Sequence, residues 1–171
     1  MEKKLISIKS KRKKSLFILD EGRLNILRKF LNGENVKFRM LSEKYSRIGV
    51  LDIIKELLLI GEDLVISDLL LEESIAIVLY LLYSGNLDRL TEFVRRVSGR
   101  SIILPFAGFL KEDLEYIIGA YNLEDKVSFD LWDDDVVAII KSLKYLDSCM
   151  KGSLYRFWMG LVKKHSLMFG S

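Results

Sequence analysis

The side chains that most often carry out catalysis are scarce in this sequence and lie far apart. The chain has one cysteine, Cys149, and one histidine, His165, so it can form neither an intramolecular disulfide nor a zinc site built from several Cys and His ligands. His165 follows Leu161 by four residues, which places both on one face of a helix. We therefore interpret His165 as a packing residue on an apolar helix face.

Two acidic runs could bind a divalent cation or transfer protons. Asp133–Asp135 precedes an apolar periodic segment, where we expect one aspartate to cap a helix, and a hard cation would need further oxygen ligands from elsewhere in the fold. Glu72 and Glu73 are adjacent, so their side chains point in different directions on a helix. We expect both runs to stabilise the first turns of helices.

Phosphate-binding glycine motifs are missing from the sequence. Neither a Walker loop nor a G-x-G-x-x-G pattern follows a strand-like segment. The sequence therefore predicts no catalytic residue, no cofactor and no metal site, and it favours an accessory binding protein that is not an enzyme. A small enzyme whose site is assembled from scattered Glu, Asp and Tyr remains an open alternative, because sequence spacing does not reveal such a site.

Clustered basic residues are the strongest functional signal. The segment Lys9–Lys14 is dense in lysine and arginine, and Arg95, Arg96 and Arg100 gather near the end of a predicted helix. Phosphate contacts need such clusters, although a solvated charge run is an equal alternative at a formal net charge of +3. Three tyrosines could stack on unpaired bases or pack in the core: Tyr45, Tyr83 and Tyr121.

The length and composition favour one α/β domain spanning residues 1–171. Half of the 171 residues are hydrophobic and 30% are charged, which suits a single well-packed core with a charged surface. The periodicities predict a single mixed sheet covered by helices, in the order ββαβαααβαβαα. Its first two strands form an N-terminal β-hairpin, which requires an antiparallel pair.

The predicted elements follow from alternation, helical spacing and turn residues. The expected strands are Leu5–Ile8, Leu16–Leu19, Val36–Met40, Ser101–Phe106 and Val127–Leu131. The expected helices are Arg23–Leu31, Val50–Ile60, Leu69–Tyr83 with Asp68 as its N-cap, Leu87–Val97, Leu110–Ile118, Val136–Leu146 and Leu154–Met168. On Leu87–Val97 the spacing directs Arg89, Glu92, Arg95 and Arg96 outward.

The expected location is a reducing cytoplasm. The first apolar run, Leu16–Leu19, is too short for a secretory signal, and the apolar tracts are too short or too charged to span a bilayer. The chain contains no glutamine but much Lys, Glu, Ile and Leu, which favours a thermophilic, archaeal source. We expect no membrane contact and no small-molecule substrate.

The order of elements and several local patterns resemble the TPRKB-type subunit of the KEOPS complex, the assembly that makes threonylcarbamoyl adenosine in tRNA. The resemblance covers most of the domain. It is carried by Arg23–Leu31, Val36–Met40, Val50–Ile54, Leu69–Glu73 and Ser84–Asn86, followed by Ser101–Leu104, Glu112–Ile118, Val127–Leu131 and Val136–Leu146. Ile48–Val50 and Asn86–Leu87 depart from the family, which often has a histidine and a Gln-Ile pair there.

This resemblance implies a non-catalytic subunit that binds the small KEOPS kinase subunit and helps recruit tRNA through its unpaired 3′ end. Such an end is held by phosphate-directed cations together with stacking. The candidate nucleic-acid-binding residues are Arg47, Lys55, Arg89, Arg95 and Arg96. The alternative is an unrelated nucleic-acid-binding accessory protein, such as a replication subunit or a viral protein, that uses the basic hairpin.

Overall fold

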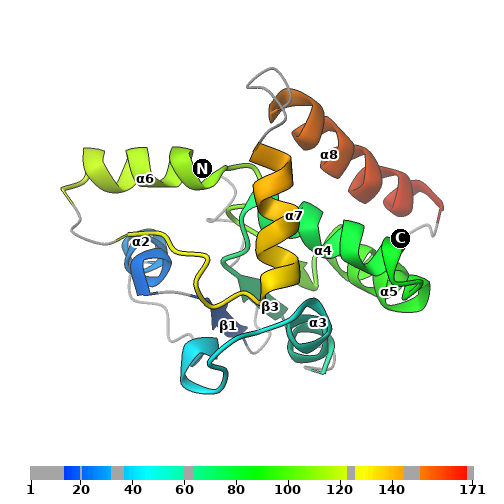
Figure 1. Ribbon diagram of the computed structural model, residues 1–171, viewed down its shortest axis with the longest axis horizontal. Coiled ribbons are helices and arrows are strands. Elements are labelled where there is room, and N and C mark those ends of the chain that lie inside the picture. Colours follow the sequence, from blue (N-terminus) through cyan, green and yellow to red (C-terminus); the bar gives the residue numbers. More distant parts are fainter. Residues whose placement is uncertain are drawn as a thin grey trace.

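The computed structural model describes residues 14–19, 21–31, 37–59, 64–122, 126–144 and 151–168. In chain order, its elements are β1 (Lys14–Ile18), α2 (Glu21–Leu31), β2 (Lys37–Met40), the 3-10 helix η1 (Leu41–Glu43), α3 (Val50–Leu58), β3 (Leu64–Ser67), α4 (Leu71–Tyr83), α5 (Leu87–Ser98), β4 (Ile102–Ile103), α6 (Lys111–Ala120), α7 (Asp134–Lys144) and α8 (Lys151–Met168). Figure 1 shows these elements, and the predicted α/β class with one sheet is confirmed.

The described strands form one parallel sheet in the order β2-β1-β3-β4. Strand β1 pairs with β2 along one edge and with β3 along the other, and both pairings are parallel. The expected antiparallel pairing of Leu16–Leu19 is therefore wrong, because both edges of β1 are already occupied. The other half of the predicted hairpin, Leu5–Ile8, lies outside the described residues, as do Lys9 to Lys13 of its basic turn.

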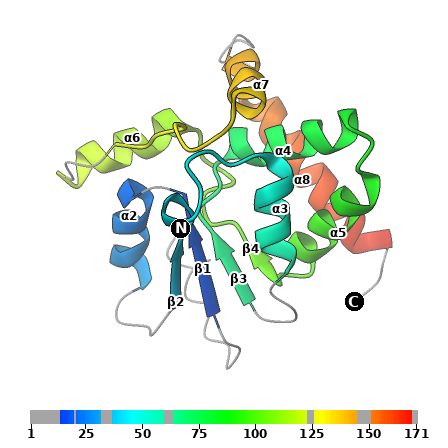
Figure 2. The same cartoon turned by 60° about the horizontal axis from the view of Figure 1, so that its bottom comes forward.

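Helices pack on both faces of this sheet. Leu64 and Ile66 of β3 belong to the same hydrophobic cluster as residues of α2 and α6. Val65, which points to the opposite face, belongs to the cluster formed with α3, α4 and α5. Figure 2 shows the strands between α2 and α3. The chain thus forms three layers, helices on either side of a parallel sheet, as βαβ connections require.

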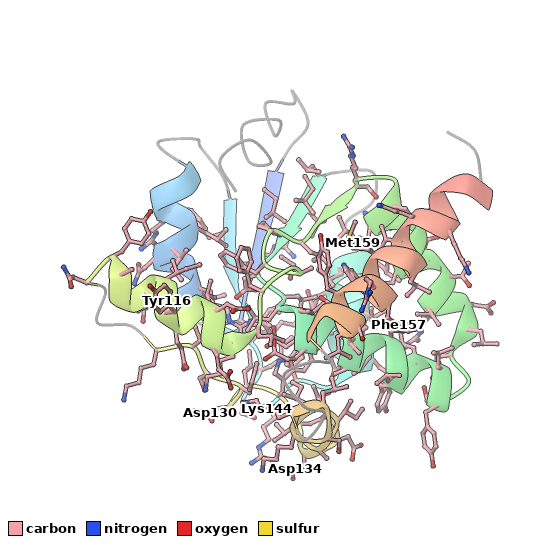
Figure 3. All side chains as sticks on the ribbon, turned by 90° about the horizontal axis from the view of Figure 1, so that it is seen from above. Tyr116, Asp130, Asp134, Lys144, Phe157 and Met159 are labelled. Atoms are coloured by element: carbon pink, nitrogen blue, oxygen red, sulfur yellow. The ribbon has the colours of Figure 1, made fainter. Side chains whose placement is uncertain are left out.

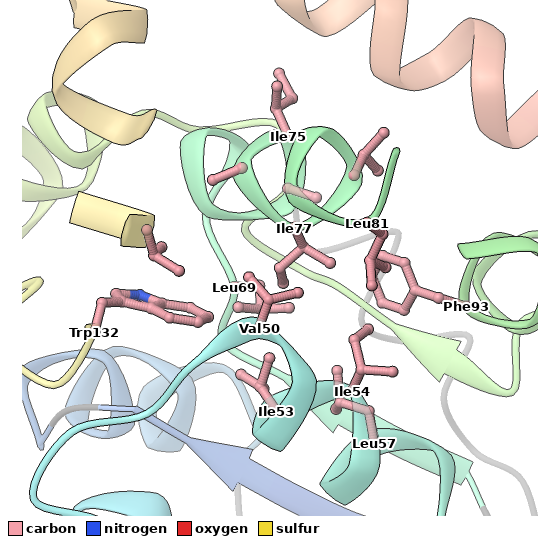
Figure 4. Close-up of a cluster of buried hydrophobic side chains, with 14 of the residues drawn as sticks. Val50, Ile53, Ile54, Leu57, Leu69, Ile75, Ile77, Leu81, Phe93 and Trp132 are labelled. Carbon is pink, nitrogen blue, oxygen red and sulfur yellow. The ribbon is translucent and has the colours of Figure 1, made fainter. Parts of the chain in front are cut away.

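The cluster that contains Val65 is the larger of the two hydrophobic cores. Trp132 is 2% exposed and lies with residues of α3, α4 and α5, which include Val50, Ile77 and Phe93 (Figure 4). Burying aromatic side chains of this size stabilises a fold strongly. This core fixes the mutual position of the helices that carry the basic residues considered below.

Strand β3 was not predicted from the sequence. All four of its residues, Leu64–Ser67, are buried, so the strand lacks the alternation that marks a strand with one solvent-exposed face. Helix α4 then begins at Leu71, with Leu70 in the N-cap position. The expected N-cap, Asp68, does not cap α4; its carboxylate accepts a hydrogen bond from the backbone N–H of Leu19 at 2.8 Å.

The predicted strand Val127–Leu131 is not a strand. Residues 126–129 have no regular structure. The nearby Trp132 forms an isolated parallel bridge with Ile48. The backbone N–H of Ile48 donates to Leu131 at 2.7 Å, and that of Asp133 donates to Ile48 at 3.0 Å. A Cβ on Gly49, beside this bridge, would lie 2.7 Å from a carboxylate oxygen of Asp133, so a larger residue there would require the Asp133 side chain to shift.

Candidate nucleic-acid interface

Two of the predicted RNA-binding residues flank or lie on α3. The guanidinium of Arg47 donates to the carboxylate of Asp134 at 2.7 Å, and both side chains are largely exposed. Lys55 is exposed on α3 itself. An exposed ion pair of this kind is weak, so a phosphate can replace Asp134 as the partner of Arg47 at little cost.

Helix α5 carries the other three candidates, and they differ in environment. Arg89 is exposed. Arg95 is exposed and forms a two-pronged contact with Glu92, with distances of 2.8 and 2.6 Å. Arg96 is only 5% exposed, so the prediction that it points outward is wrong.

Arg96 is held by backbone carbonyls at the end of α3. Its Nη1 donates to the oxygens of Leu57 and Leu58 at 3.1 and 3.0 Å, and its Nε lies 3.3 Å from the hydroxyl of Ser101. A cation at a helix C-terminus satisfies carbonyls that lack a partner within the helix and interacts favourably with its dipole. Arg96 therefore joins α5 to α3 and is not available to bind RNA.

Three of the four exposed candidates lie on two neighbouring helices. α3 and α5 pack against each other on the same face of the sheet, as Figure 2 shows. Lys55 comes from α3, and Arg89 and Arg95 come from the two ends of α5. We call these three residues, together with Arg47, the basic helix surface.

A group of exposed apolar residues, the apolar corner, flanks the turn between α4 and α5. We define it as Leu82, Tyr83 and Leu87, which are 46%, 97% and 55% exposed. The turn between the two helices depends on Gly85, whose φ of 72° is readily adopted by glycine. Exposed apolar side chains that form a contiguous patch mark contact sites for other proteins.

A buried charge network lies at the carboxyl ends of β1 and β3. Arg23 and Glu73 are both fully buried, and two guanidinium nitrogens of Arg23 donate to the two carboxylate oxygens of Glu73 at 2.7 and 2.8 Å. The indole N–H of Trp132 and the backbone N–H of Leu70 also donate to Glu73, at 2.7 and 2.8 Å. Four donors therefore engage the two oxygens of one carboxylate.

The position of this network in the sheet is informative. In the order β2-β1-β3-β4, β2 is added on one side of β1, whereas β3 and β4 are added on its other side, so the topological switch point lies between β1 and β3. Open α/β sheets usually bind ligands beyond the carboxyl ends of the strands at a switch point of this kind. Here Arg23 also donates to the carbonyl oxygens of Asp68 and Ser128, each at 3.1 Å. The protein's own side chains occupy the position that a ligand takes in many related architectures.

Glu72 stands next to this network and contacts a different helix. Its carboxylate accepts hydrogen bonds from the backbone N–H of Lys111, the first residue of α6, at 3.0 and 3.2 Å. Burial raises the pKa of Glu72, although the Lys111 hydrogen bond and the charge of Lys144 act in the opposite direction. The raised pKa means that the folded protein binds this proton more tightly than the unfolded chain.

We expect Glu72→Gln to stabilise the protein at neutral pH. Glutamine keeps an acceptor for Lys111 but carries no charge to bury. Stability from protonated Glu72 is lost as the pH rises through its raised folded pKa, so the melting temperature of the variant should exceed that of the wild type at about pH 7. The difference should shrink towards about pH 4. Calorimetry across this range tests it, with the exposed Glu112→Gln as a control; a constant difference would contradict it.

Three residues considered in the sequence remain: Asp133, Cys149 and His165. The carboxylate of Asp133 accepts from the backbone N–H of Val136 at 3.0 Å, which confirms the predicted aspartate cap. Within the described ranges, no group of three or more His, Cys, Asp or Glu side chains could hold a metal ion. Cys149 and the side chain of His165 lie outside the described residues.

Two further surface features were not visible in the sequence. A shallow hollow of about 510 Å³ lies along α6 and is lined by Gly108, Phe109, Glu112, Asp113, Tyr116 and Ile117. The ring of Phe129 lies near two lysines, Lys111 and Lys144, whose Nζ atoms are 5.4 and 5.7 Å from its centroid. Figure 3 labels Tyr116 and Lys144, one from each feature.

Comparisons with protein-family models, with curated proteins and with solved structures give no match for this chain. None of the helices in the described ranges combines the length and the apolar character that a membrane crossing needs.

Proposed function

We propose that this chain is a non-catalytic adaptor that docks a partner protein and binds RNA. The observation that carries this proposal is that exposed apolar side chains end α4 and begin α5, two residues before the exposed Arg89 of the basic helix surface. Apolar side chains supply the affinity of protein contacts, and cations of the basic helix surface supply phosphate contacts. Both kinds of side chain are exposed on the same chain, so one molecule can hold a protein and an RNA together.

The resemblance to the TPRKB-type subunit suggests which partners these are. The small KEOPS kinase would dock on the apolar corner, whose Ser84–Asn86 turn is among the segments that carry the resemblance. The unpaired 3′ end of tRNA would meet Arg47, Lys55, Arg89 and Arg95. The proposed setting is cytoplasmic tRNA modification.

The buried charge network supports a non-catalytic role. A general base needs a free lone pair that reaches the substrate, whereas the carboxylate of Glu73 is fully buried and accepts from Arg23, Trp132 and Leu70. These contacts are typical of a structural anion. The charged residues at the carboxyl edge of the sheet thus stabilise the fold.

Co-purification with the small KEOPS kinase tests the docking step. We expect tagged wild-type protein to retain the kinase, and Tyr83→Ala to weaken retention by about tenfold or more, as loss of an apolar anchor does. Tyr116→Ala is the matched control, since Tyr116 is 79% exposed but lies on α6. If the wild type does not retain the kinase, with or without tRNA, the KEOPS assignment is wrong.

An RNA-binding accessory protein unrelated to KEOPS is the alternative partner assignment. It predicts salt-dependent RNA binding without kinase binding. Arg95→Glu should weaken RNA binding in either case, because Arg95 is exposed while its partner Glu92 would then repel phosphate as well. Deleting Lys9–Lys13 separates the two assignments, since only the second uses that basic turn.

A hydrolytic enzyme is the second candidate function. It is favoured by one observation, the burial of three carboxylates, Asp68, Glu72 and Glu73, in the segment that follows β3 and begins α4. Incubation of the protein with single-stranded RNA and Mg²⁺ or Mn²⁺ distinguishes the candidates. Cleavage that Glu73→Gln abolishes, in a variant shown to be folded, would overturn the non-catalytic proposal.

A further inference from the structure

Phe129 is an aromatic ring flanked by cations at the carboxyl edge of the sheet. The ring is half-buried, and the Nζ atoms of Lys111 and Lys144 lie 5.4 and 5.7 Å from its centroid. Lys144 is exposed, and the side chain of Lys111 is 26% exposed. Phe129 also packs against both hydrophobic clusters, and the two lysines whose ammonium groups lie near its ring are both at least partly exposed.

The ring is held in position by the buried charge network. The carbonyl of the preceding residue, Ser128, accepts from Arg23 at 3.1 Å, and the guanidinium of Arg23 lies 6.0 Å from the ring centroid. The carbonyl of Phe129 itself accepts from the backbone N–H of Trp132 at 3.0 Å. A ring fixed in this way loses little freedom when a ligand stacks on it.

The lysines come from two different helices. Lys111 is the first residue of α6 and also pairs with Glu115 at 3.5 Å, whereas Lys144 is the last residue of α7. Both ammonium groups end flexible side chains and lie 5.4 and 5.7 Å from the same ring centroid, so both can turn towards a phosphate bound beside the ring. Stacking of a base on an aromatic side chain is stronger than an exposed lysine–ring contact, so a nucleotide can displace the lysines from the ring and retain them at its phosphate.

We propose that Phe129, Lys111 and Lys144 form the binding position of an unpaired RNA nucleotide. The base stacks on Phe129, and the adjoining phosphate pairs with the two lysines. This inference rests on the proposed RNA binding and adds a specific stacking site to it. Single-stranded nucleic acid is recognised through this combination of an aromatic platform and a cationic backbone contact.

The test measures binding of the full chain to a short fluorescein-labelled single-stranded RNA ending in CCA, by fluorescence anisotropy over a range of KCl concentrations. We expect Phe129→Leu to lower the affinity about tenfold and Phe129→Tyr, which keeps the ring, to stay within about twofold of the wild type. Lys144→Gln should reduce the slope of log K against log salt by about 0.7. Lys163→Gln, exposed on α8, should leave the slope unchanged.

The outcomes separate this inference from the proposed function. If the wild type binds the RNA and both Phe129→Leu and Lys144→Gln bind equally well, the stacking site is wrong while RNA binding stands. If the wild type does not bind at any salt concentration, the RNA part of the proposed function fails. Thermal unfolding establishes that each variant is folded, and Lys144→Gln, a surface change, carries the test if Phe129→Leu is not.

Discussion

Replacing Arg23 with methionine is expected to lower the free energy of unfolding by about 3–5 kcal/mol, because the substitution leaves the carboxylate of Glu73 buried without its counter-charge. Both side chains are fully buried and joined by two short hydrogen bonds. Methionine fills much of the volume of the arginine stem, so the loss would arise mainly from the charge. Urea denaturation followed by circular dichroism measures it.

The double variant Arg23→Met with Glu73→Gln isolates this cause. Neutralising the orphaned carboxylate should recover part of the loss, since a buried ion pair can be replaced by neutral groups at lower cost than either partner can be removed alone. Arg47→Met provides the control, because its pair with Asp134 is exposed and is worth about 0–1 kcal/mol. A loss below about 1 kcal/mol for Arg23→Met would show that the buried pair is not essential.

The second large effect is expected at Arg96. Arg96→Met should cost about 2–4 kcal/mol, because two carbonyls at the end of α3 lose a charged donor in a site that is only 5% exposed. Arg96→Lys should recover part of this loss, since one ammonium cannot reproduce the planar guanidinium contacts. The same denaturation experiment measures both variants.

The neighbouring residue supplies a matched control. Arg95→Met removes a guanidinium from the same turn of α5, but its contact with Glu92 is exposed, so a change of about 0–1 kcal/mol is expected. If Arg95→Met and Arg96→Met have equal effects on stability, the structural role of Arg96 is refuted. RNA binding should respond in the opposite order, weakening for Arg95→Glu in a folded protein.

Helices were easier to predict from this sequence than strands. α3 and α5 carry apolar residues at helical spacing and were expected within a few residues of their observed bounds. β3 was missed because its four residues are buried on both faces and look like part of a longer apolar run. Val127, Phe129 and Leu131 alternate like a strand, but they find no partner strand among the described residues and only a bridge beside them.

The roles of individual side chains depended on contacts that local patterns do not encode. Arg96 follows Phe93 by three residues, so it lies at the border of the buried face of α5, and this spacing was the available signal. Lys111, Phe129 and Lys144 are separated by long stretches of chain. They meet only because α6, α7 and the segment before α7 converge at the carboxyl edge of the sheet.

The central position of β1 has a consequence for synthesis of the chain on the ribosome. β1 is the earliest described strand, yet its two neighbours are β2 and the much later β3. While the chain is being made, the edge of β1 that β3 will occupy remains an unpaired backbone edge until Leu64–Ser67 has left the exit tunnel. Unpaired edges of this kind promote association between nascent chains, so we expect this protein to be most prone to association between the synthesis of its second and third strands.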